Sequence, residues 1–346
     1  MAVTGSFTLP PGFALGLAAD AQARFDISDE SGVGWVRRGA RVAATNIGLS
    51  DEDAGRVAVV ATEIAGNTVR HGGGGTVLIR ALPEGGVELL AYDCGRGIPD
   101  IEAAQRDGHS TAGTPGTGLG AIRRMSDQFE IASTPGRGTI VLARLWARPA
   151  GRHRDLPGSA QLGVVCQPVA GETACGDSWA VRELPDRLLV VVADGLGHGP
   201  GAASASRAAV EACITRPEAG LAERLALAHE LIAGSRGSGV AIASIDRERR
   251  CLNYAAVGNI GGVLVGAACD QGLPSHNGTV GVAMRRVQEF IFTYAPGALL
   301  VMHTDGITGR WRHDHSPTHP ALLAAEIFRD HQRGRDDATV ACVRLP

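Results

Sequence analysis

The positions of hydrophobic and polar residues predict two helices near the start of the chain. Apolar residues recur at helical spacing over 34–46 and again over 50–70. Ser50, with Asp53 three residues later, fits a capping box, in which the two residues satisfy backbone groups at a helix start. The second helix is therefore expected to begin at Ser50.

Strand patterns follow these helices. Apolar runs at 76–81 and 87–92 flank a Pro-Glu-Gly-Gly turn and predict a β-hairpin. A glycine-rich loop leads into a predicted helix at 120–126, and a second hairpin is predicted to turn at 134–138. This half of the chain is expected to be α+β.

The second half is dominated by short strand patterns. Two helices rich in small residues are expected at about 200–213 and 219–234. The expected strands lie at 162–166, 178–182, 187–193, 239–245, 251–257, 261–265, 289–293, 298–303 and 338–344. Many strands with few helices favour stacked antiparallel sheets covered by helices.

A charged, proline-containing stretch without periodicity separates the halves. We interpret 149–160 as a linker between a first domain at 1–148 and a second at 161–346. A length of 346 residues agrees with two domains. No internal repeat is seen, so two different domains are expected.

The composition excludes several chemistries. All 33 positively charged side chains are Arg, so a Walker A loop, the lysine of a eukaryotic-type protein kinase and a Schiff-base lysine are ruled out. A net charge of -3 offers no basic field for nucleic acid. The seven cysteines include no CxxC pair, and no apolar run approaches the roughly 18 residues that cross a bilayer. We expect a soluble, cytoplasmic protein with neither a nucleic-acid nor a membrane partner.

One face of the second predicted helix presents polar groups together. Glu63, Asn67 and His71 fall at i, i+4 and i+8. An amide oxygen beside a carboxylate can hold Mg²⁺ and polarise an attacking hydroxyl, although a surface helix can show the same spacing without function.

Two glycine-containing motifs follow. Asp93 stands at a strand end, where it can accept from an exocyclic amino group such as that of adenine, while Gly95 and Gly97 let the backbone approach a flat ligand. A tight turn capped by Asp93 is the alternative. The glycine loop at 113–120 opens a helix, whose first amides bind phosphate without lysine. Each motif alone is weak, but their order, completed by Gly138-Thr139 on a returning hairpin, is specific.

This arrangement resembles the GHKL ATPases, and within them the RsbT and anti-sigma-factor group of bacterial serine kinases, over roughly residues 25–146. The resemblance rests on the segments 63–67, 93–102, 108–120 and 125–131. It implies a Bergerat α/β sandwich that binds ATP and Mg²⁺ and phosphorylates a serine of a STAS-domain antagonist protein. Without a dimerisation helix bearing a phosphoacceptor histidine, a sensor histidine kinase is disfavoured, and His71 is interpreted as structural.

The resemblance also implies roles for individual residues. Glu63 would be the general base, Asn67 would bind Mg²⁺, Asp93 would bind adenine, and Thr139 would support Asp93 through water. The loop 108–120 would be the ATP lid. The other implied nucleotide-binding residues are Gly95, Gly97, Gly116, Thr117, Gly118, Leu119 and Gly120.

Four aspartates in the second half each flank an apolar strand: Asp177, Asp194, Asp305 and Asp336. Each alone would be an ordinary turn residue. Oxygen ligands from separate strand ends, without a His or Cys pattern, favour Mg²⁺ or Mn²⁺ over zinc. Two such ions about 3.5–4 Å apart can clamp an in-line phosphoryl displacement.

Over about 160–346 the chain resembles the PPM metal-dependent serine/threonine phosphatases of the SpoIIE type, including short RsbX-like members. The most specific element is Asp-Gly-Leu-Gly-His-Gly-Pro-Gly-Ala, which starts at Asp194. The resemblance implies an α-β-β-α sandwich in which catalytic Asp194 bridges two metals and the Gly195 carbonyl binds one of them. Asp305 and Asp336 would hold the other metal, and Asp177 would lie near the metal pair as a direct or water-mediated ligand.

Asp337, His198 and His303 lie near these aspartates in the sequence, but we do not favour them as metal ligands or proton donors. Asp337 is a less favoured ligand than Asp336. His198 and His303 could be zinc ligands or proton donors, but ordinary hydrogen-bonded imidazoles are favoured.

The sequence thus predicts a bifunctional regulator, a serine kinase joined to a phosphoserine phosphatase, that acts on STAS-domain proteins in stressosome or sigma-factor control. In one alternative, the first domain is an adaptor or anti-sigma-like module that does not phosphorylate its partner. In another, it only senses ATP. Because opposed activities on one serine would waste ATP, we expect either reciprocal gating or different substrates.

Overall fold

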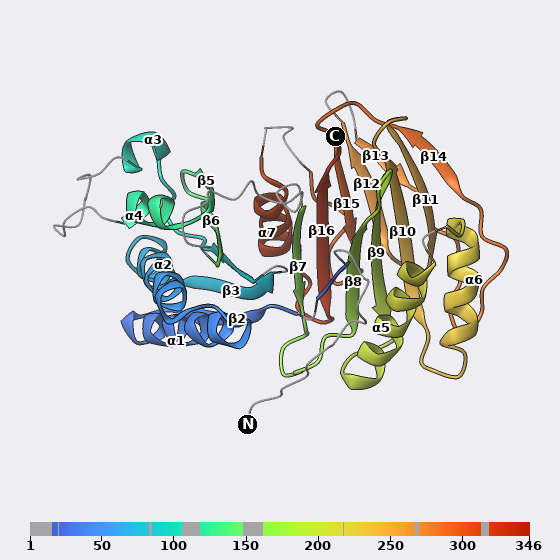
Figure 1. The fold of residues 1–346 in the computed structure, drawn as a ribbon, viewed down its shortest axis with the longest axis horizontal. Helices are drawn as coiled ribbons and strands as arrows, with labels where there is room; N and C mark the ends of the chain where they lie inside the picture. Colours follow the sequence, from blue (N-terminus) through green and yellow to red (C-terminus); the bar gives the residue numbers. More distant parts are fainter. Residues whose placement is uncertain are drawn as a thin grey trace.

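The computed structural model describes residues 16–19, 21–82, 85–105, 118–147, 162–216, 218–266, 270–312 and 318–346. These residues form three β-sheets in two domains that lie side by side (Figure 1). The expected linker at 149–160 lies outside the described residues.

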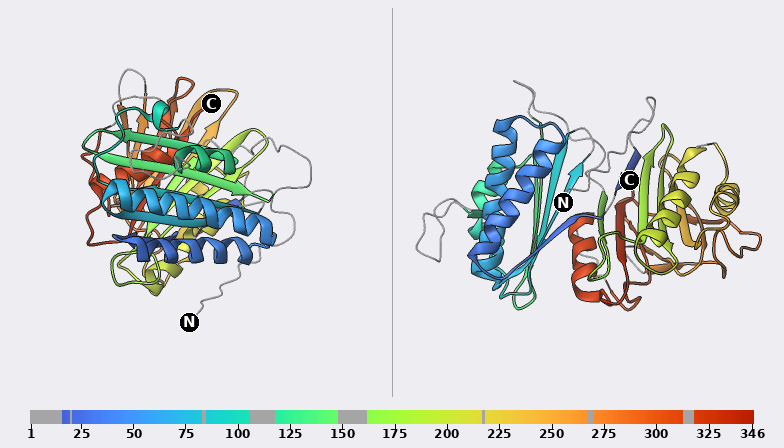
Figure 2. Two further views of the ribbon diagram at one scale, coloured as in Figure 1. Left: turned by 90° about the vertical axis from the view of Figure 1, so that its left-hand side faces the viewer. Right: turned by 90° about the horizontal axis from the view of Figure 1, so that it is seen from below.

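The first domain is one antiparallel sheet with helices on one face (Figure 2). In sheet order its strands are β2 (Ala23–Ile27), β3 (Gly75–Leu82), β4 (Gly86–Tyr92), β6 (Gly138–Trp146) and β5 (Gln128–Thr134). Its helices are α1 (Glu30–Asn46), α2 (Asp51–Gly72), α3 (Ile101–Ala104) and α4 (Gly118–Met125). Both expected hairpins and all three expected helices of this half are confirmed.

The start of α2 follows the predicted capping box. The Ser50 hydroxyl accepts from the Asp53 amide and donates to the Asp53 carboxylate, both at 3.1 Å. From this start the helix places Val57, Ile64 and other apolar residues against the sheet.

The second domain consists of two stacked antiparallel sheets. The first has the order β1 (Gly16–Ala19), β8 (Asp177–Glu183), β9 (Arg187–Gly195), β10 (Ser238–Asp246), β11 (Cys251–Val257) and β14 (Phe290–Thr293). The second has the order β13 (Asp270–Leu273), β12 (Gly261–Val265), β15 (Leu299–His303), β16 (Ala338–Arg344) and β7 (Leu162–Gln167). Trp179, Tyr254 and Leu300 belong to the core between them.

Helices cover the outer faces of both sheets, as the strand pattern predicted. Helices α5 (Pro200–Thr215) and α6 (Leu221–Leu231) lie on the six-stranded sheet, and α7 (Pro320–His331) lies on the five-stranded sheet (Figure 1). The predicted fold, a two-domain α+β chain with a C-terminal α-β-β-α sandwich, is confirmed.

Five elements, β1, β2, α3, β13 and α7, have no counterpart in the sequence prediction. Helix α7 was missed because its first six residues, Pro-Ala-Leu-Leu-Ala-Ala, are all apolar, and its polar residues at helical spacing, Glu326, Arg329 and Asp330, occupy only its second half. Strand β1 is only four residues long and pairs with β8. The chain therefore contributes a strand to the second domain before it forms the first, which a division at a single linker does not anticipate.

The two domains share a hydrophobic core around α7. Leu90 and Leu142, on the face of the first sheet opposite its helices, join Val165 and Phe328 of the second domain in one buried cluster. The rings of Tyr92 and Phe328 lie 6.4 Å apart. Because the first sheet and α7 bury each other, the first sheet is covered on both faces.

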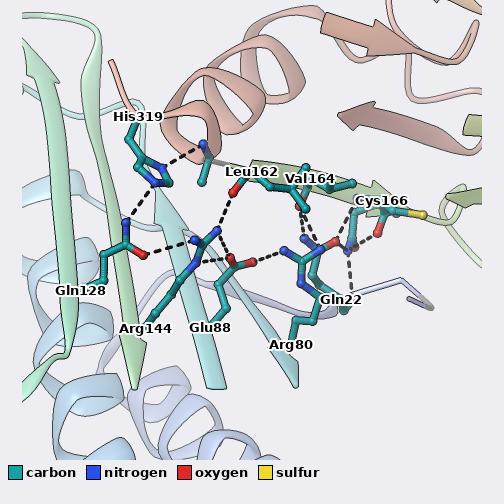
Figure 3. Close-up of polar contacts among 11 residues, drawn as sticks. Gln22, Arg80, Glu88, Gln128, Arg144, Leu162, Val164, Cys166 and His319 are labelled. Atoms are coloured by element: carbon teal, nitrogen blue, oxygen red, sulfur yellow. Dashed lines mark hydrogen bonds and ion pairs between the residues drawn. The ribbon is translucent and has the colours of Figure 1, made fainter. Parts of the chain in front are cut away.

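Side chains of the first domain also cover the open edge of β7 (Figure 3). Arg144 donates to the Leu162 carbonyl at 2.7 Å. Gln22 donates to the Val164 carbonyl at 2.6 Å and accepts from the Cys166 amide at 2.9 Å. These bonds replace the missing neighbouring strand, because buried backbone polar groups need partners.

The arginines at this edge are held by one buried carboxylate, Glu88, whose side chain is 1% exposed. Arg80 donates to it at 2.6 Å and Arg144 at 2.8 Å (Figure 3). Burial alone would raise the pKa of Glu88, but the two guanidinium groups outweigh it and the pKa is lowered.

We expect Glu88→Gln to destabilise the protein by about 3–5 kcal/mol, because it leaves two buried guanidinium groups without their counter-charge. Urea unfolding measures this loss. Since the folded pKa lies below the ordinary 4.5, the stabilisation is present above about pH 4.5 and is lost as pH falls through the folded pKa.

The matched control is Glu183→Gln, which breaks the exposed Arg247–Glu183 pair and should cost less than about 1 kcal/mol. An equal loss in both variants would contradict a stabilising role for Glu88 at the domain interface.

Candidate functional sites

Asp93 is fixed at the end of β4 by backbone amides. Its Oδ1 accepts from the amides of Gly95 at 2.9 Å and Thr139 at 3.2 Å. Burial raises the pKa of Asp93, and these two bonds together with the charges of Arg329 and His71 act in the opposite direction. The carboxylate is thereby oriented to accept from a ligand.

Thr139 is bonded to Asp93 through its backbone. Its amide donates directly to the Asp93 carboxylate, and its hydroxyl lies 2.9 Å from the Ser133 hydroxyl. A contact of Thr139 through water stays a prediction.

Packing and backbone conformation within the protein require glycine at positions 95 and 97, close to Asp93. A Cβ on Gly95 would lie 2.6 Å from the Gly72 Cα, and Gly97 has a φ of +69° with the Thr134 carbonyl in close approach. The motif thus packs the loop after β4 against the end of α2 and the β5–β6 hairpin, whether or not a ligand is present.

Helix α2 brings the other predicted residues to this region. Glu63 and Asn67 are partly buried on the same face, and a Cβ on Gly118 would lie 3.4 Å from both polar atoms of the Asn67 side chain. Asn67 therefore lies against the start of α4, where residues 118–120 present helix N-terminal amides. His71 contacts Arg96 at 3.2 Å, in agreement with a structural role.

The predicted lid is described only at its end. Gly118, Leu119 and Gly120 form the first residues of α4. Gly116, Thr117 and the rest of the lid back to 108 lie outside the described residues.

In the second domain, strand pairing brings two predicted aspartates together. Asp177 begins β8 and is the register partner of Asp194 in β9. The Gly195 amide donates to the Gly176 carbonyl at 3.1 Å, and a Cβ on Gly195 would collide with the Ala202 backbone of α5. A glycine is therefore required immediately after Asp194.

Asp305 and Asp336 approach the same centre from two loops. Asp194 has its pKa raised to about 7, first by burial and then by the charges of Asp305 and Asp336, while a hydrogen bond from Asn259 lowers it. Asn259 also donates to Asp305 at 2.7 Å. The four predicted aspartates thus form one electrostatically coupled cluster.

Asp177 contains an unusual buried atom. One oxygen accepts from the Thr304 hydroxyl at 2.8 Å, whereas Oδ1 is buried without a hydrogen-bond partner among the described residues. Burial and the charge of Asp194 raise the pKa of Asp177 well above its ordinary value. An orphaned oxygen beside mutually repelling carboxylates has the chemistry of a hard-cation site.

Within the described ranges, no three His, Cys, Asp or Glu side chains already surround a common point at metal-binding distance. The donor chemistry fits a divalent cation, but the side chains must move closer together to bind one. Repulsion among the carboxylates and the Asn259–Asp305 bond explain their separation.

Three ionisable residues near the aspartates, Asp337, His198 and His303, are each in contact with other groups of the protein. Asp337 accepts from the Val169 and Gly176 amides, both at 2.7 Å, so both of its oxygens anchor loops. His198 lies 2.6 Å from Glu172. His303 is buried beside Trp311, and burial lowers its pKa.

The sequence analysis missed two polar residues that contact the cluster, Asn259 and Thr304. Asn259 lies in the turn between β11 and β12, away in sequence from all four aspartates, yet its side chain contacts two of the carboxylates. Thr304 precedes Asp305 directly, so its place at a strand end was the available signal. Only the folded sheets show that both side chains point toward the aspartates.

Comparisons with known proteins divide the chain in the same way. Residues 28–145 match the histidine kinase-like ATPase domain, and residues 185–346 match stage II sporulation protein E (SpoIIE). Serine/threonine-protein kinase RsbT of Bacillus subtilis is 34% identical over 116 residues, which cover 33% of this chain and 87% of RsbT.

The second half has its own relatives. Phosphoserine phosphatase RsbX of Bacillus subtilis is 26% identical over 138 residues, which cover 40% of this chain and 69% of RsbX. A solved structure described under the bacterial stressosome, as a modular system adapted to control secondary messenger signaling, superposes with a TM-score of 0.51 at 27% identity. It covers 53% of this chain and 98% of that one.

None of the helices within the described ranges is both long and apolar enough to cross a membrane.

The aspartate cluster predicts that stability falls as pH rises, which is the reverse of the pH dependence expected for Glu88. The folded pKa of Asp194, about 7, exceeds its ordinary 3.8, so the unfolded chain loses this proton first as pH rises. In the presence of a chelator, the protein should therefore lose stability between about pH 4 and 7. We expect Asp194→Asn to remove that loss and to raise the melting temperature at pH 8 by about 2–4 °C for each 1 kcal/mol recovered.

Thermal unfolding at pH 4 and pH 8 in chelator measures the effect. Asp186→Asn, which removes an exposed carboxylate paired with Arg187, is the matched control and should produce no stabilisation. A lower melting temperature for Asp194→Asn at pH 8 would contradict the repulsion.

Proposed function

The chain belongs to the RsbT-like kinases through its first domain and to the SpoIIE and RsbX-like PPM serine/threonine phosphatases through its second, and we propose that it is a bifunctional partner-switching regulator. In this proposal the first domain phosphorylates a serine of a STAS-domain protein. The second domain removes phosphate from a phosphoserine of such a protein. Sigma-factor or second-messenger control would be the downstream outcome.

The first domain would act by positioning and electrostatics. Asp93, oriented by the Gly95 and Thr139 amides, would accept from the adenine amino group. The amides at the start of α4 would bind phosphate oxygens, and Asn67 beside them would hold Mg²⁺. Glu63, one helical turn before Asn67, would orient the serine hydroxyl and accept its proton.

The second domain would hold two divalent cations, Mn²⁺ or Mg²⁺. Asp194 and the Gly195 carbonyl would bind one cation, Asp194 with Asp305 and Asp336 the other, and Asp177 would bind directly or through water. Bound cations supply Lewis acidity toward the phosphoryl group and a nucleophile at neutral pH. Thr304 would hold Asp177 in position through the bond it already makes.

The observation that most strongly supports the phosphatase is the pairing of Asp177 with Asp194 in neighbouring strands, where a buried Asp177 oxygen has no hydrogen-bond partner among the described residues. A charge cluster that opposes folding is expected where function requires it. For the kinase, the corresponding support is the amide-held carboxylate Asp93, which lies against Gly72 at the end of the helix that carries Glu63 and Asn67.

A second candidate function keeps the ATP site without phosphoryl transfer, so that the first domain is an adaptor or an anti-sigma-like module. The packing of Gly95 and Gly97 against the protein itself favours this candidate, because it gives the motif a structural reason. Transfer of label from ATP to a STAS-domain protein separates the two.

We expect the wild-type chain to transfer phosphate from γ-labelled ATP to a serine of a STAS-domain protein, and in the presence of Mn²⁺ to release it again. Glu63→Gln should slow transfer by at least about 100-fold, because it removes the general base. Asp194→Asn should abolish release while transfer continues, so that label accumulates on the partner.

Glu52→Gln, an exposed carboxylate in the first turn of the same helix, is the matched control and should transfer normally. Partner binding without label in the wild type would favour the adaptor. Metal-dependent release that persists in Asp194→Asn would refute the assignment of the second site.

A further inference from the structure

Helix α7 of the second domain contacts the proposed nucleotide site of the first. Arg329, near its C-terminal end, donates to the backbone carbonyl of Asp93 at 3.2 Å. Its side chain is only 6% exposed, and Asp330 holds the guanidinium through bonds of 2.6 and 2.9 Å. Arg137, in the β5–β6 turn, reaches the same Asp330 at 3.1 Å.

The same helix end is bonded to the loops of the aspartate cluster. The His331 carbonyl accepts from the Thr308 amide at 2.9 Å, and the Arg333 amide donates to the Gly306 carbonyl at 2.8 Å. Gly306 directly follows Asp305. Five residues beyond His331, the chain reaches Asp336.

One short segment, residues 328–336, therefore connects the two sites. It contacts the peptide of Asp93, is bonded to the loop after Asp305 and contains Asp336. Burial of α7 as far as Phe328 fixes the helix between the sheets, and the bonds made by Arg329 and His331 connect its end to a loop of each domain.

Arg329 interacts differently with the two charge states of Asp93. Its positive charge favours the ionised carboxylate, the form that accepts a hydrogen bond from adenine. A nucleotide held by Asp93 and the docked position of α7 therefore favour each other.

We propose that the C-terminal end of α7 couples nucleotide binding in the first domain to metal binding in the second, with Arg329 as the positioning residue. The inference rests on the proposed function, since it takes Asp93 as the nucleotide site and the aspartates as the phosphatase site. A bound nucleotide strengthens the docked arrangement, which holds the loops of Asp305 and Asp336 in place for the cations.

The test uses the full chain and p-nitrophenyl phosphate hydrolysis at buffered free Mn²⁺, with and without a non-hydrolysable ATP analogue. The analogue is kept far below the metal concentration, and its binding is measured separately by equilibrium dialysis. In the wild type, we expect the analogue to lower the half-activating Mn²⁺ concentration about fivefold, at the lower end of typical site-to-site coupling.

Three variants test the route through α7, each compared with itself with and without analogue. The quantity compared is the ratio of the half-activating Mn²⁺ concentration without analogue to that with analogue. Arg329→Gln should bring this ratio close to one. Arg137→Gln, at a side chain that is 61% exposed, should reduce it in part. Arg216→Gln, at an exposed position just beyond α5, should retain the full ratio.

The outcomes separate the inference from the proposed function. If the analogue does not bind, or Mn²⁺ supports no hydrolysis, the proposed function fails and the coupling with it. If both are observed but the analogue leaves the Mn²⁺ dependence unchanged, or Arg329→Gln retains the full ratio, the coupling alone is overturned.

Discussion

The unpaired edge of β7 is the constraint on which the arrangement of the domains depends. A buried edge strand must find partners for its carbonyl and amide groups. Here Arg144 and Gln22 of the first domain bond directly to that edge, and Glu88 supplies a buried counter-charge for Arg144 and Arg80 (Figure 3). Since Arg144 lies in β6 and Gln22 directly precedes β2, these side chains specify one orientation of the domains.

This orientation makes α7 a shared element. In the second domain it covers the outer face of a sheet, and in the first it covers the face opposite α1 and α2. Its end consequently lies beside Asp93 and continues into the loop that contains Asp336. Joining two domains through a common core therefore brings two sites within reach of one helix.

The two sites use opposite physical strategies. Around Asp93, backbone amides and closely packed glycines orient a single carboxylate. Around Asp194, burial and then the charges of neighbouring carboxylates raise its pKa. The first arrangement is satisfied by the protein itself, whereas the second is costly until a cation compensates its charge.

The sequence by itself determined the two fold types, most strands and helices, and the aspartates at strand ends, because these depend on local periodicity and on motifs that are continuous in the chain. It did not determine β1 or α7, because β1 has only four residues and the first half of α7 is entirely apolar, so the periodic signal of each is weak. It also gave no sign of Arg329 beside Asp93, or of Asn259 beside Asp305. Those contacts join residues 236 and 46 positions apart, so only the packing of sheets and domains could decide them.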